Sequence, residues 1–235
     1  MNSLILKNSA GIISDPAVIQ HMHETLKASI GDTFKCTIID QGLCTGTIVS
    51  LNSQECRMEL STLKPFQPQW FNLVVGISRP QTSKKILEHA TTFGAKKIHF
   101  FKAELSEKSY LTSKVFDDGE SMGHLLSGLS QSTIYGNIPV IKVDKFNPAD
   151  SYTHEPQKFI LDLNGSGNFL DLKSSIDFNT PITLAIGPER GFVSSDIERF
   201  HQAGFKSVKI SSSVLRVEHA IYSAVSQLEL IRGKF

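Results

Sequence analysis

Short apolar runs recur along the chain, and their setting changes near residue 70. Before that point, apolar and β-branched residues alternate between turns rich in glycine, aspartate and asparagine, which predicts short antiparallel strands. These runs lie at 12–13, 34–39 and 46–51. The segment 16–28 is predicted to be a helix, capped by Ser14 or Asp15, with Pro16 at its first position. The pattern indicates a small β-rich domain.

After a segment rich in proline and glutamine at 65–70, short apolar runs alternate with helical patterns. The runs lie at 73–77, 97–101, 140–143, 159–163, 182–186 and 207–210. Helices are predicted at 83–93, about 121–131, 195–203 and 217–231. Such alternation predicts an α/β layer with a largely parallel, buried sheet.

Composition agrees with an ordinary globular protein and limits the alternatives. The chain has 235 residues, of which 40% are hydrophobic and 20% charged, so it is neither disordered nor fibrous. No stretch approaches the ~20 apolar residues of a membrane span, and the segment 1–7 is too short for a secretory signal. We therefore expect a cytoplasmic protein. The odd number and spacing of Cys36, Cys44 and Cys56 favour neither disulfides nor a zinc site, and we expect small buried side chains.

Ligands of open parallel sheets bind where the strands end, which directs attention to three loops. The loop 164–168 contains Gly165 and Gly167, which permit positive φ and close approach of a ligand, although a flexible turn is the favoured explanation of this loop taken alone. The loop 187–192 precedes Ser195 and Glu198, which have the spacing of a capping box. It lacks the spacing of a phosphate-binding loop.

The third loop, 211–214, leads into the final predicted helix. Arg216 and Glu218 lie at the entrance of this helix, where side chains and free backbone N–H groups face a ligand. Ala220, Ile221 and later apolar residues recur every three or four positions, which is typical of a core or a subunit interface.

Two motifs in this part of the chain resemble those of a known family. They are Ile186-Gly187-Pro188-Glu189-x-Gly191-Phe192, followed by Ser195-x-x-Glu198, and Leu215-Arg216-x-Glu218-x-Ala220. In this order and near the end of the chain they are similar to the signature of the ribosomal RNA small subunit methyltransferase E family. Weaker similarity extends to 84–95, to Gln131-Ser132 with Ile138-Pro139, and to His21, Leu26-Lys27 and Gly31-Asp32.

The resemblance implies an α/β fold of the SPOUT type, in which the last segment forms a trefoil knot. It implies a methyltransferase domain at 70–235, preceded by a PUA-like, RNA-binding β-barrel at 1–69. The family uses S-adenosylmethionine to methylate N3 of one uridine in 16S ribosomal RNA of the small subunit, as a homodimer through the final helix.

The resemblance also assigns roles to residues. Arg216 is expected to stabilise the developing uracil anion, and Glu189 or Glu218 to position groups or remove a proton. The cofactor is expected at Leu163, Asn164, Ile186, Gly187, Pro188, Gly191, Ile210, Ser211 and Leu215. RNA is expected at His21, Lys27 and Lys35, and no metal is expected. Helix-terminal ion pairs remain the alternative explanation for the charged residues.

The distribution of charge and the departures from the family's motifs leave two further hypotheses open. The formal net charge is +1, and residues 1–70 hold five basic and six acidic residues, against 19 and 17 in the remainder. A slightly acidic RNA-binding domain, with Glu24 where the family has arginine, allows a methyltransferase acting on another RNA. Arg190 and Ser211–Ser213, which replace family glycines, allow a paralogue that binds RNA or cofactor without catalysis.

Overall fold

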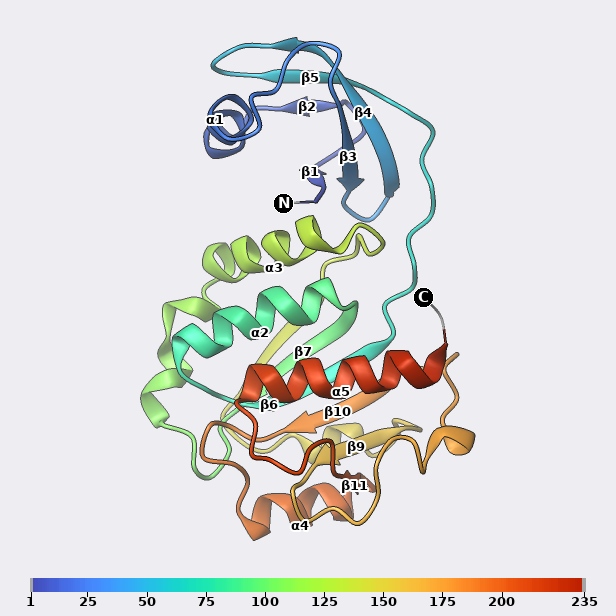
Figure 1. Ribbon diagram of the computed structural model, residues 1–235. Helices are drawn as coiled ribbons and strands as arrows, with labels where there is room; N and C mark the ends of the chain where they lie inside the picture. The colour runs from blue at the N-terminus through green and yellow to red at the C-terminus, as the bar shows by residue number, and fades with distance from the viewer. Residues whose placement is uncertain (1, 234–235) are drawn as a thin grey trace. The chain divides into compact units, whose positions relative to one another are not determined.

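The computed structural model describes residues 2–233 and divides the chain into two compact units. The first unit comprises residues up to Pro68 together with Leu126–Ile138. Its five-stranded sheet has the order β1-β3-β4-β5-β2 (Figure 1). The strands are β1 (Leu4–Leu6), β2 (Ile12–Ile13), β3 (Thr33–Ile38), β4 (Gly42–Leu51) and β5 (Cys56–Leu60). All neighbours are antiparallel except β1 and β3, which are parallel.

The predicted helix of this unit is confirmed at its start and is shorter than expected at its end. In α1 (Pro16–Glu24), the Asp15 side chain accepts hydrogen bonds from the N–H groups of Ala17 and Val18. The helix ends at Glu24, with Thr25 as its C-cap, and the left-handed conformation of Lys27, with φ of 49°, prevents it from continuing to residue 28.

The three cysteines are buried and free, as the sequence predicts. They pack in the core of the first unit with Ile38 and Ile48. Burial raises the pKa of the Cys36 thiol to about 12, so this thiol stays protonated at neutral pH.

The segment Leu126–Ile138 includes the end of α3 (Asp118–Ser132) and groups with the first unit. The N–H groups of Asn2 and Ser3 both donate to the carbonyl of Ser130 at 2.9 Å. The Asn137 side chain donates to the carboxylate of Asp40 at 2.8 Å. These hydrogen bonds tie a segment distant in sequence to the β-rich unit.

The second unit contains a six-stranded sheet in which every neighbouring pair is parallel, as predicted. The order is β11-β9-β10-β6-β7-β8. The strands are β6 (Phe71–Gly76), β7 (Ala95–Phe101), β8 (Val140–Asp144), β9 (Lys158–Leu161), β10 (Ile182–Ile186) and β11 (Lys206–Val208). Because all six run in one direction, their carboxyl ends share one edge of the sheet.

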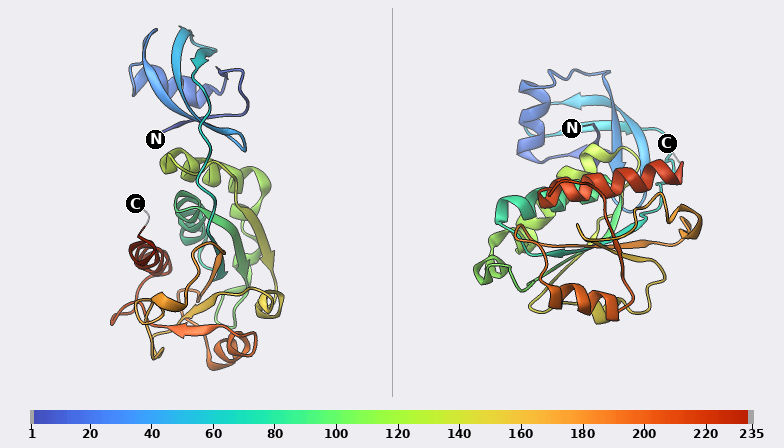
Figure 2. Two further views of the ribbon diagram at one scale, coloured as in Figure 1. Left: turned by 90° about the vertical axis from the view of Figure 1, so that its right-hand side faces the viewer. Right: turned by 60° about the horizontal axis from the view of Figure 1, so that its bottom comes forward.

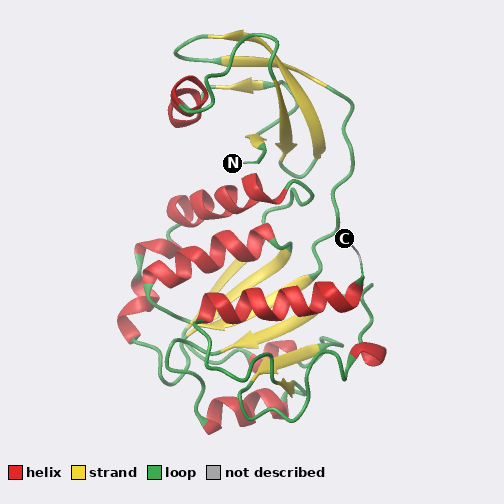
Figure 3. Cartoon of the chain, viewed as in Figure 1, coloured by secondary structure: helices red, strands yellow, loops and turns green. Residues whose placement is uncertain are grey.

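Helices cover both faces of this sheet (Figures 2 and 3). They are α2 (Pro80–Thr92), α4 (Ser194–Gln202) and α5 (Val217–Arg232), with short 3₁₀ turns at Lys108–Thr112, Lys114–Phe116, Ala149–Tyr152 and Lys173–Ser175. Helices α2 and α5 pack together on one face, and Phe200 of α4 packs on the other face against Val74, Ile160 and Ala185. The central strands β6 and β10 are buried throughout, which explains their mainly apolar sequences; their polar residues Asn72 and Thr183 hydrogen-bond to each other.

One local prediction in this unit is wrong, and one conformational possibility is not realised. The helix α4 begins at Ser194, with Val193 as its N-cap and no capping side chain, so Ser195 and Glu198 do not form a capping box. Gly165 and Gly167 are absent from the residues with positive φ, so the loop after β9 does not use left-handed glycine.

Candidate functional site

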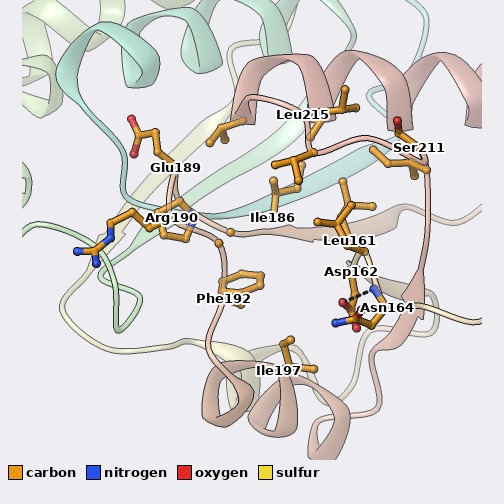
Figure 4. Close-up of a pocket in the computed structure, with 18 of the residues that line it drawn as sticks. Leu161, Asp162, Asn164, Ile186, Glu189, Arg190, Phe192, Ile197, Ser211 and Leu215 are labelled. Atoms are coloured by element: carbon orange, nitrogen blue, oxygen red, sulfur yellow. Dashed lines mark hydrogen bonds between the residues drawn. The ribbon is translucent and has the colours of Figure 1, made fainter.

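A cavity of about 330 Å³ lies where β9, β10 and β11 end, and helix α5 begins beside it (Figure 4). All the residues that the sequence assigns to cofactor binding line this cavity. They are Leu163, Asn164, Ile186, Gly187, Pro188, Gly191, Ile210, Ser211 and Leu215. The structure thus brings together three loops spread over about fifty residues of sequence, as expected for strands that end at one edge of a parallel sheet.

The loop after β10 is pressed against the end of β6. A Cβ atom on Gly76 would lie 2.4 Å from Pro188 Cδ and 2.7 Å from Pro188 N, so only glycine permits this approach. Gly191 supplies the one left-handed turn of the loop, with φ of 75°. Arg190 has no positive φ, so its side chain occupies the family's glycine position without backbone strain.

The carboxylate of Glu189 is held by the start of a neighbouring helix. Glu189 Oε1 accepts a hydrogen bond from the backbone N–H of Arg79 at 2.8 Å. Arg79 is the N-cap of α2, where free N–H groups and the helix dipole favour a negative charge. This contact orients the loop between β10 and α4, although Glu189 itself remains exposed.

The glycines after β9 approach the chain's own backbone. A Cβ atom on Gly165 would lie 3.1 Å from Asp162 O, Lys209 N and Val208 C. The Lys209 N–H donates to Gly167 O at 2.8 Å. Close packing of this loop on the segment after β11 shapes the wall of the cavity beside Asn164.

The third loop is anchored from α5. Gln227 Nε2 of that helix donates to Ile210 O at 2.8 Å, and Ser211 Oγ accepts from Ser213 N at 3.0 Å. Val214 is 79% exposed, at the outer rim of the cavity. No serine between 211 and 213 has positive φ, so the family's glycine is not required here by backbone conformation.

The two charged residues at the start of α5 have different environments. Arg216 is the exposed N-cap of the helix and has no ion pair or hydrogen bond from its side chain within residues 2–233. Glu218 is buried, and its carboxylate lies 3.3 Å from Lys85 Nζ of α2. Burial would raise the pKa of Glu218, but its own backbone N–H and the Lys85 ammonium outweigh burial and lower it. Neither Arg216 nor Glu218 lines the cavity.

The residues predicted to bind RNA lie in the first unit, whereas the cavity lies in the second. His21 is half-buried in α1, Lys27 is exposed just after that helix, and Lys35 is exposed on β3. The structure does not place these three residues in the cavity.

Several lining residues were missed by the sequence analysis. They are apolar or acidic residues at strand ends and on helices, namely Leu161, Asp162, Ile197, Val208, Val217 and Ala220. Leu161 and Val208 end their strands, so their position at the carboxyl edge was a usable signal. Ile197 lies on α4, and no sequence motif links it to the loops.

Comparison with known proteins identifies the class to which this fold and cavity belong. A family model described as an RNA methyltransferase domain matches residues 65–229, so the chain belongs to the RNA methyltransferases. A ribosomal RNA small subunit methyltransferase E from Treponema pallidum is 30% identical over 87% of this chain and 79% of that protein. The chain therefore belongs to the ribosomal RNA small subunit methyltransferase E family, which confirms the resemblance.

Two further comparisons agree with this assignment. Ribosomal RNA small subunit methyltransferase E 1 from Borreliella burgdorferi is 34% identical over 65% of this chain, and the match spans 63% of that relative's length. The crystal structure of a ribosomal RNA small subunit methyltransferase E from Neisseria gonorrhoeae, bound to S-adenosyl methionine, has a TM-score of 0.78. It shares 18% identity and covers 98% of both chains, which shows a common fold. No helix within residues 2–233 is long and apolar enough to cross a membrane.

Proposed function

We propose that this protein methylates N3 of a uridine in 16S ribosomal RNA of the small subunit, with S-adenosylmethionine as methyl donor. The observation that carries the proposal is the cavity at the ends of β9, β10 and β11, which gathers the two family motifs around one space. Family membership and the cofactor named for the Neisseria relative support the choice of donor.

The residues of the cavity fit this donor. Its volume of about 330 Å³ lies in the range of small-molecule sites, and its walls combine apolar side chains with loop backbone. The floor includes Ile186 and Leu161, which suit an adenine ring, while a Cβ atom at Gly187 would lie 3.0 Å from Phe192 N. Gly187 thus lets the loop after β10 fold closely on its own backbone beside the cavity.

Methyl transfer to uracil N3 requires the methyl donor and the base to be positioned together, and it requires N3 to lose its proton. S-adenosylmethionine, when bound, supplies an electrophilic methyl group. Uracil N3 carries a proton and becomes a competent nucleophile when that proton is lost, so a cation beside the ring would stabilise the resulting anion. Arg216 suits this role because its guanidinium is exposed, unpaired within the described residues and next to a lining residue, Leu215.

We assign positioning roles to the two carboxylates. Glu189 holds the loop after β10 through Arg79, and Glu218 holds the start of α5 through Lys85. The lowered pKa of Glu218 keeps it charged at neutral pH and makes it a weak base.

The remaining family features complete the proposal. We infer that residues 70–235 form a SPOUT-type domain with a trefoil knot, and that 1–69 form a PUA-like barrel in which His21, Lys27 and Lys35 contact RNA. We also infer a cytoplasmic homodimer joined through α5. Crosslinking of dimers through a cysteine introduced at Leu230, which is 68% exposed on α5, would test the last point. A protein that stays monomeric at all concentrations would contradict it.

Transfer of a labelled methyl group tests the function directly. Purified protein, labelled S-adenosylmethionine and small subunits from a strain lacking the gene should yield labelled 16S RNA, with N3-methyluridine as the modified nucleoside. Total RNA from strains with and without the gene should differ at that nucleotide. Tight cofactor binding without methyl transfer to any RNA would instead favour a non-catalytic paralogue, and a label in another RNA would favour a different substrate.

A further inference from the structure

The carboxyl edge of the second unit's sheet continues beyond the cavity, across the ends of β10, β6, β7 and β8. A cationic residue follows each of these neighbouring strands. These residues are Arg190 after β10, Arg79 after β6, Lys102 after β7 and Lys145 after β8. Neighbouring strands lie about 4.8 Å apart, so the four strand ends that these residues follow span roughly 14 Å of the edge.

The four cations are available to a ligand. Arg79, Arg190 and Lys145 are exposed, and Lys102 is half-buried. Within residues 2–233 none of their side chains takes part in an ion pair or a hydrogen bond. Arg190 also lines the cavity, and Figure 4 shows it extending away from the side that carries Asn164 and Ser211.

The acidic residues of the same edge are mostly engaged. Glu189 accepts from the Arg79 N–H, and Asp144 Oδ2 lies 2.8 Å from His99 Nε2 and 2.9 Å from Lys142 Nζ. Glu104, after β7, is exposed, and its negative charge offsets part of the positive charge of the four cations.

An exposed aromatic ring ends this row of cations. Phe146 is 77% exposed and is the only exposed phenylalanine, tyrosine or tryptophan within residues 2–233. Its neighbours are fixed: the Lys102 N–H donates to Asp144 O at 3.0 Å, and Asn147 Oδ1 accepts from Ala149 N at 3.0 Å. Pro148 is buried. The backbone therefore presents the ring to solvent from a fixed position, where it adds nothing to the core.

An unpaired polynucleotide has the matching chemistry, since its phosphates attract cations and its bases stack on aromatic rings. We propose that this edge binds the single-stranded RNA segment adjoining the methylated base, with a base stacked on Phe146 and phosphates beside Arg190, Arg79, Lys102 and Lys145. The proposal rests on the proposed RNA substrate. It adds a second RNA contact surface, located in the methyltransferase unit.

Binding of a fluorescein-labelled, uridine-rich oligoribonucleotide of about 12 nucleotides to the full chain tests this surface. Phe146→Ala should weaken binding about tenfold, whereas Phe146→Trp should retain it, because stacking needs only an aromatic face. Lys145→Ala should weaken binding and reduce the slope of log affinity against log salt by about 0.7. Glu104→Gln should strengthen binding.

Matched controls lie on the same strands at the opposite, amino edge of the sheet. Val140 is 61% exposed at the start of β8, and Lys96 is exposed near the start of β7. Val140→Ala and Lys96→Ala should leave affinity unchanged. The same oligoribonucleotide annealed into a duplex should show no loss with Phe146→Ala, since its bases are not free to stack.

The outcomes separate this proposal from the proposed function. The proposed RNA surface is wrong if Phe146→Ala binds the oligoribonucleotide as tightly as Val140→Ala does. It is also wrong if Phe146→Trp loses as much affinity as Phe146→Ala. If the wild-type chain methylates small subunits while Phe146→Ala does so with an unchanged KM for RNA, the surface is also wrong and the function stands. If the variants lose oligonucleotide affinity as expected but the wild type transfers no methyl group, the surface stands and the function fails.

Discussion

The carboxylate of Glu189 and the backbone N–H of Arg79 meet at 2.8 Å, which joins the loop after β10 to the first turn of α2. The same loop is in contact with the end of β6, where Pro188 leaves no room for a side chain at Gly76. One wall of the cavity is thus set by a charge at a helix N-terminus and by a missing Cβ atom. Pro188 and Glu189 both line the cavity, so these two contacts fix residues that would lie beside a bound cofactor.

Replacing Glu189 should weaken cofactor binding through the loop. In Glu189→Ala the Arg79 N–H loses its acceptor, and the Kd for S-adenosylmethionine should rise about tenfold, as for loss of one hydrogen bond to a charged group. Glu189→Gln keeps an acceptor oxygen and should retain most of the affinity and most of the turnover. Calorimetry and methyl-transfer rates measure the two quantities.

A matched carboxylate provides the control for this comparison. Glu198 is exposed on α4, and Glu198→Ala should change neither quantity. Should Glu189→Gln bind the cofactor normally yet lose all turnover, Glu189 would be the proton acceptor, and its assignment as a positioning residue would be wrong.

Adding one methyl group at Gly76 should disturb the same wall. The Cβ atom of Gly76→Ala would lie 2.4 Å from Pro188 Cδ and 2.7 Å from Pro188 N, so the proline ring and its backbone must move. We expect a loss of about 1–3 kcal/mol in unfolding free energy, together with weaker cofactor binding. Urea unfolding and calorimetry measure these effects.

The control is Gly123→Ala. Gly123 is exposed on α3, and a Cβ atom added there would meet no atom within 4 Å, so stability should rise by up to about 1 kcal/mol. Equal stabilities of the two variants would contradict the close contact.

The regular part of the second unit was predictable because its signals are local and repeated. Buried parallel strands favour mainly apolar runs, and the six strands of this sheet, β6 to β11, all overlap the runs found in the sequence. The lining of the cavity followed from one geometric rule, since loops after parallel strands meet at one edge.

The features that failed depend on contacts distant in sequence. Ser195 has capping chemistry, but α4 starts one residue earlier and leaves it inside the helix. The strands β1 and β5 were not predicted, and β1 is only three residues long and pairs in parallel with β3. No local pattern indicates that Glu189 reaches Arg79, 110 residues away.

A buried histidine should make stability depend on pH. His99 Nδ1 lies 2.8 Å from the Tyr152 hydroxyl, and its Nε2 lies 2.8 Å from Asp144. Burial lowers the pKa of His99 below its ordinary value of 6.5, although Asp144 opposes this shift. As the pH falls below about 6.5, the unfolded chain therefore binds a proton before the folded chain does, and the unfolding free energy decreases.

Replacing His99 should make the unfolding free energy depend less steeply on pH. Urea unfolding between about pH 7.5 and 5 gives the slope of the unfolding free energy against pH. In His99→Gln this slope should be smaller than in the wild type, by at most about 1.4 kcal/mol per pH unit, even if the variant is less stable at every pH. The exposed His154→Gln controls for loss of an imidazole and should keep the wild-type slope. Parallel profiles for His99→Gln and the wild type would show that His99 does not couple protonation to folding.

Arg216 is predicted to act on the RNA base while leaving the donor site intact. Its side chain is exposed at the start of α5 and does not line the cavity, so Arg216→Ala should bind S-adenosylmethionine with unchanged Kd. Loss of the cation that stabilises the uracil anion should lower kcat for methyl transfer about a hundredfold, and Arg216→Lys should recover part of it. Because the anion forms more readily as pH rises, the rate of Arg216→Ala should recover towards alkaline pH, which a merely structural role would not produce. Arg199→Ala, an exposed arginine of α4, supplies the control and should retain full activity. Normal turnover in Arg216→Ala would remove Arg216 from the mechanism.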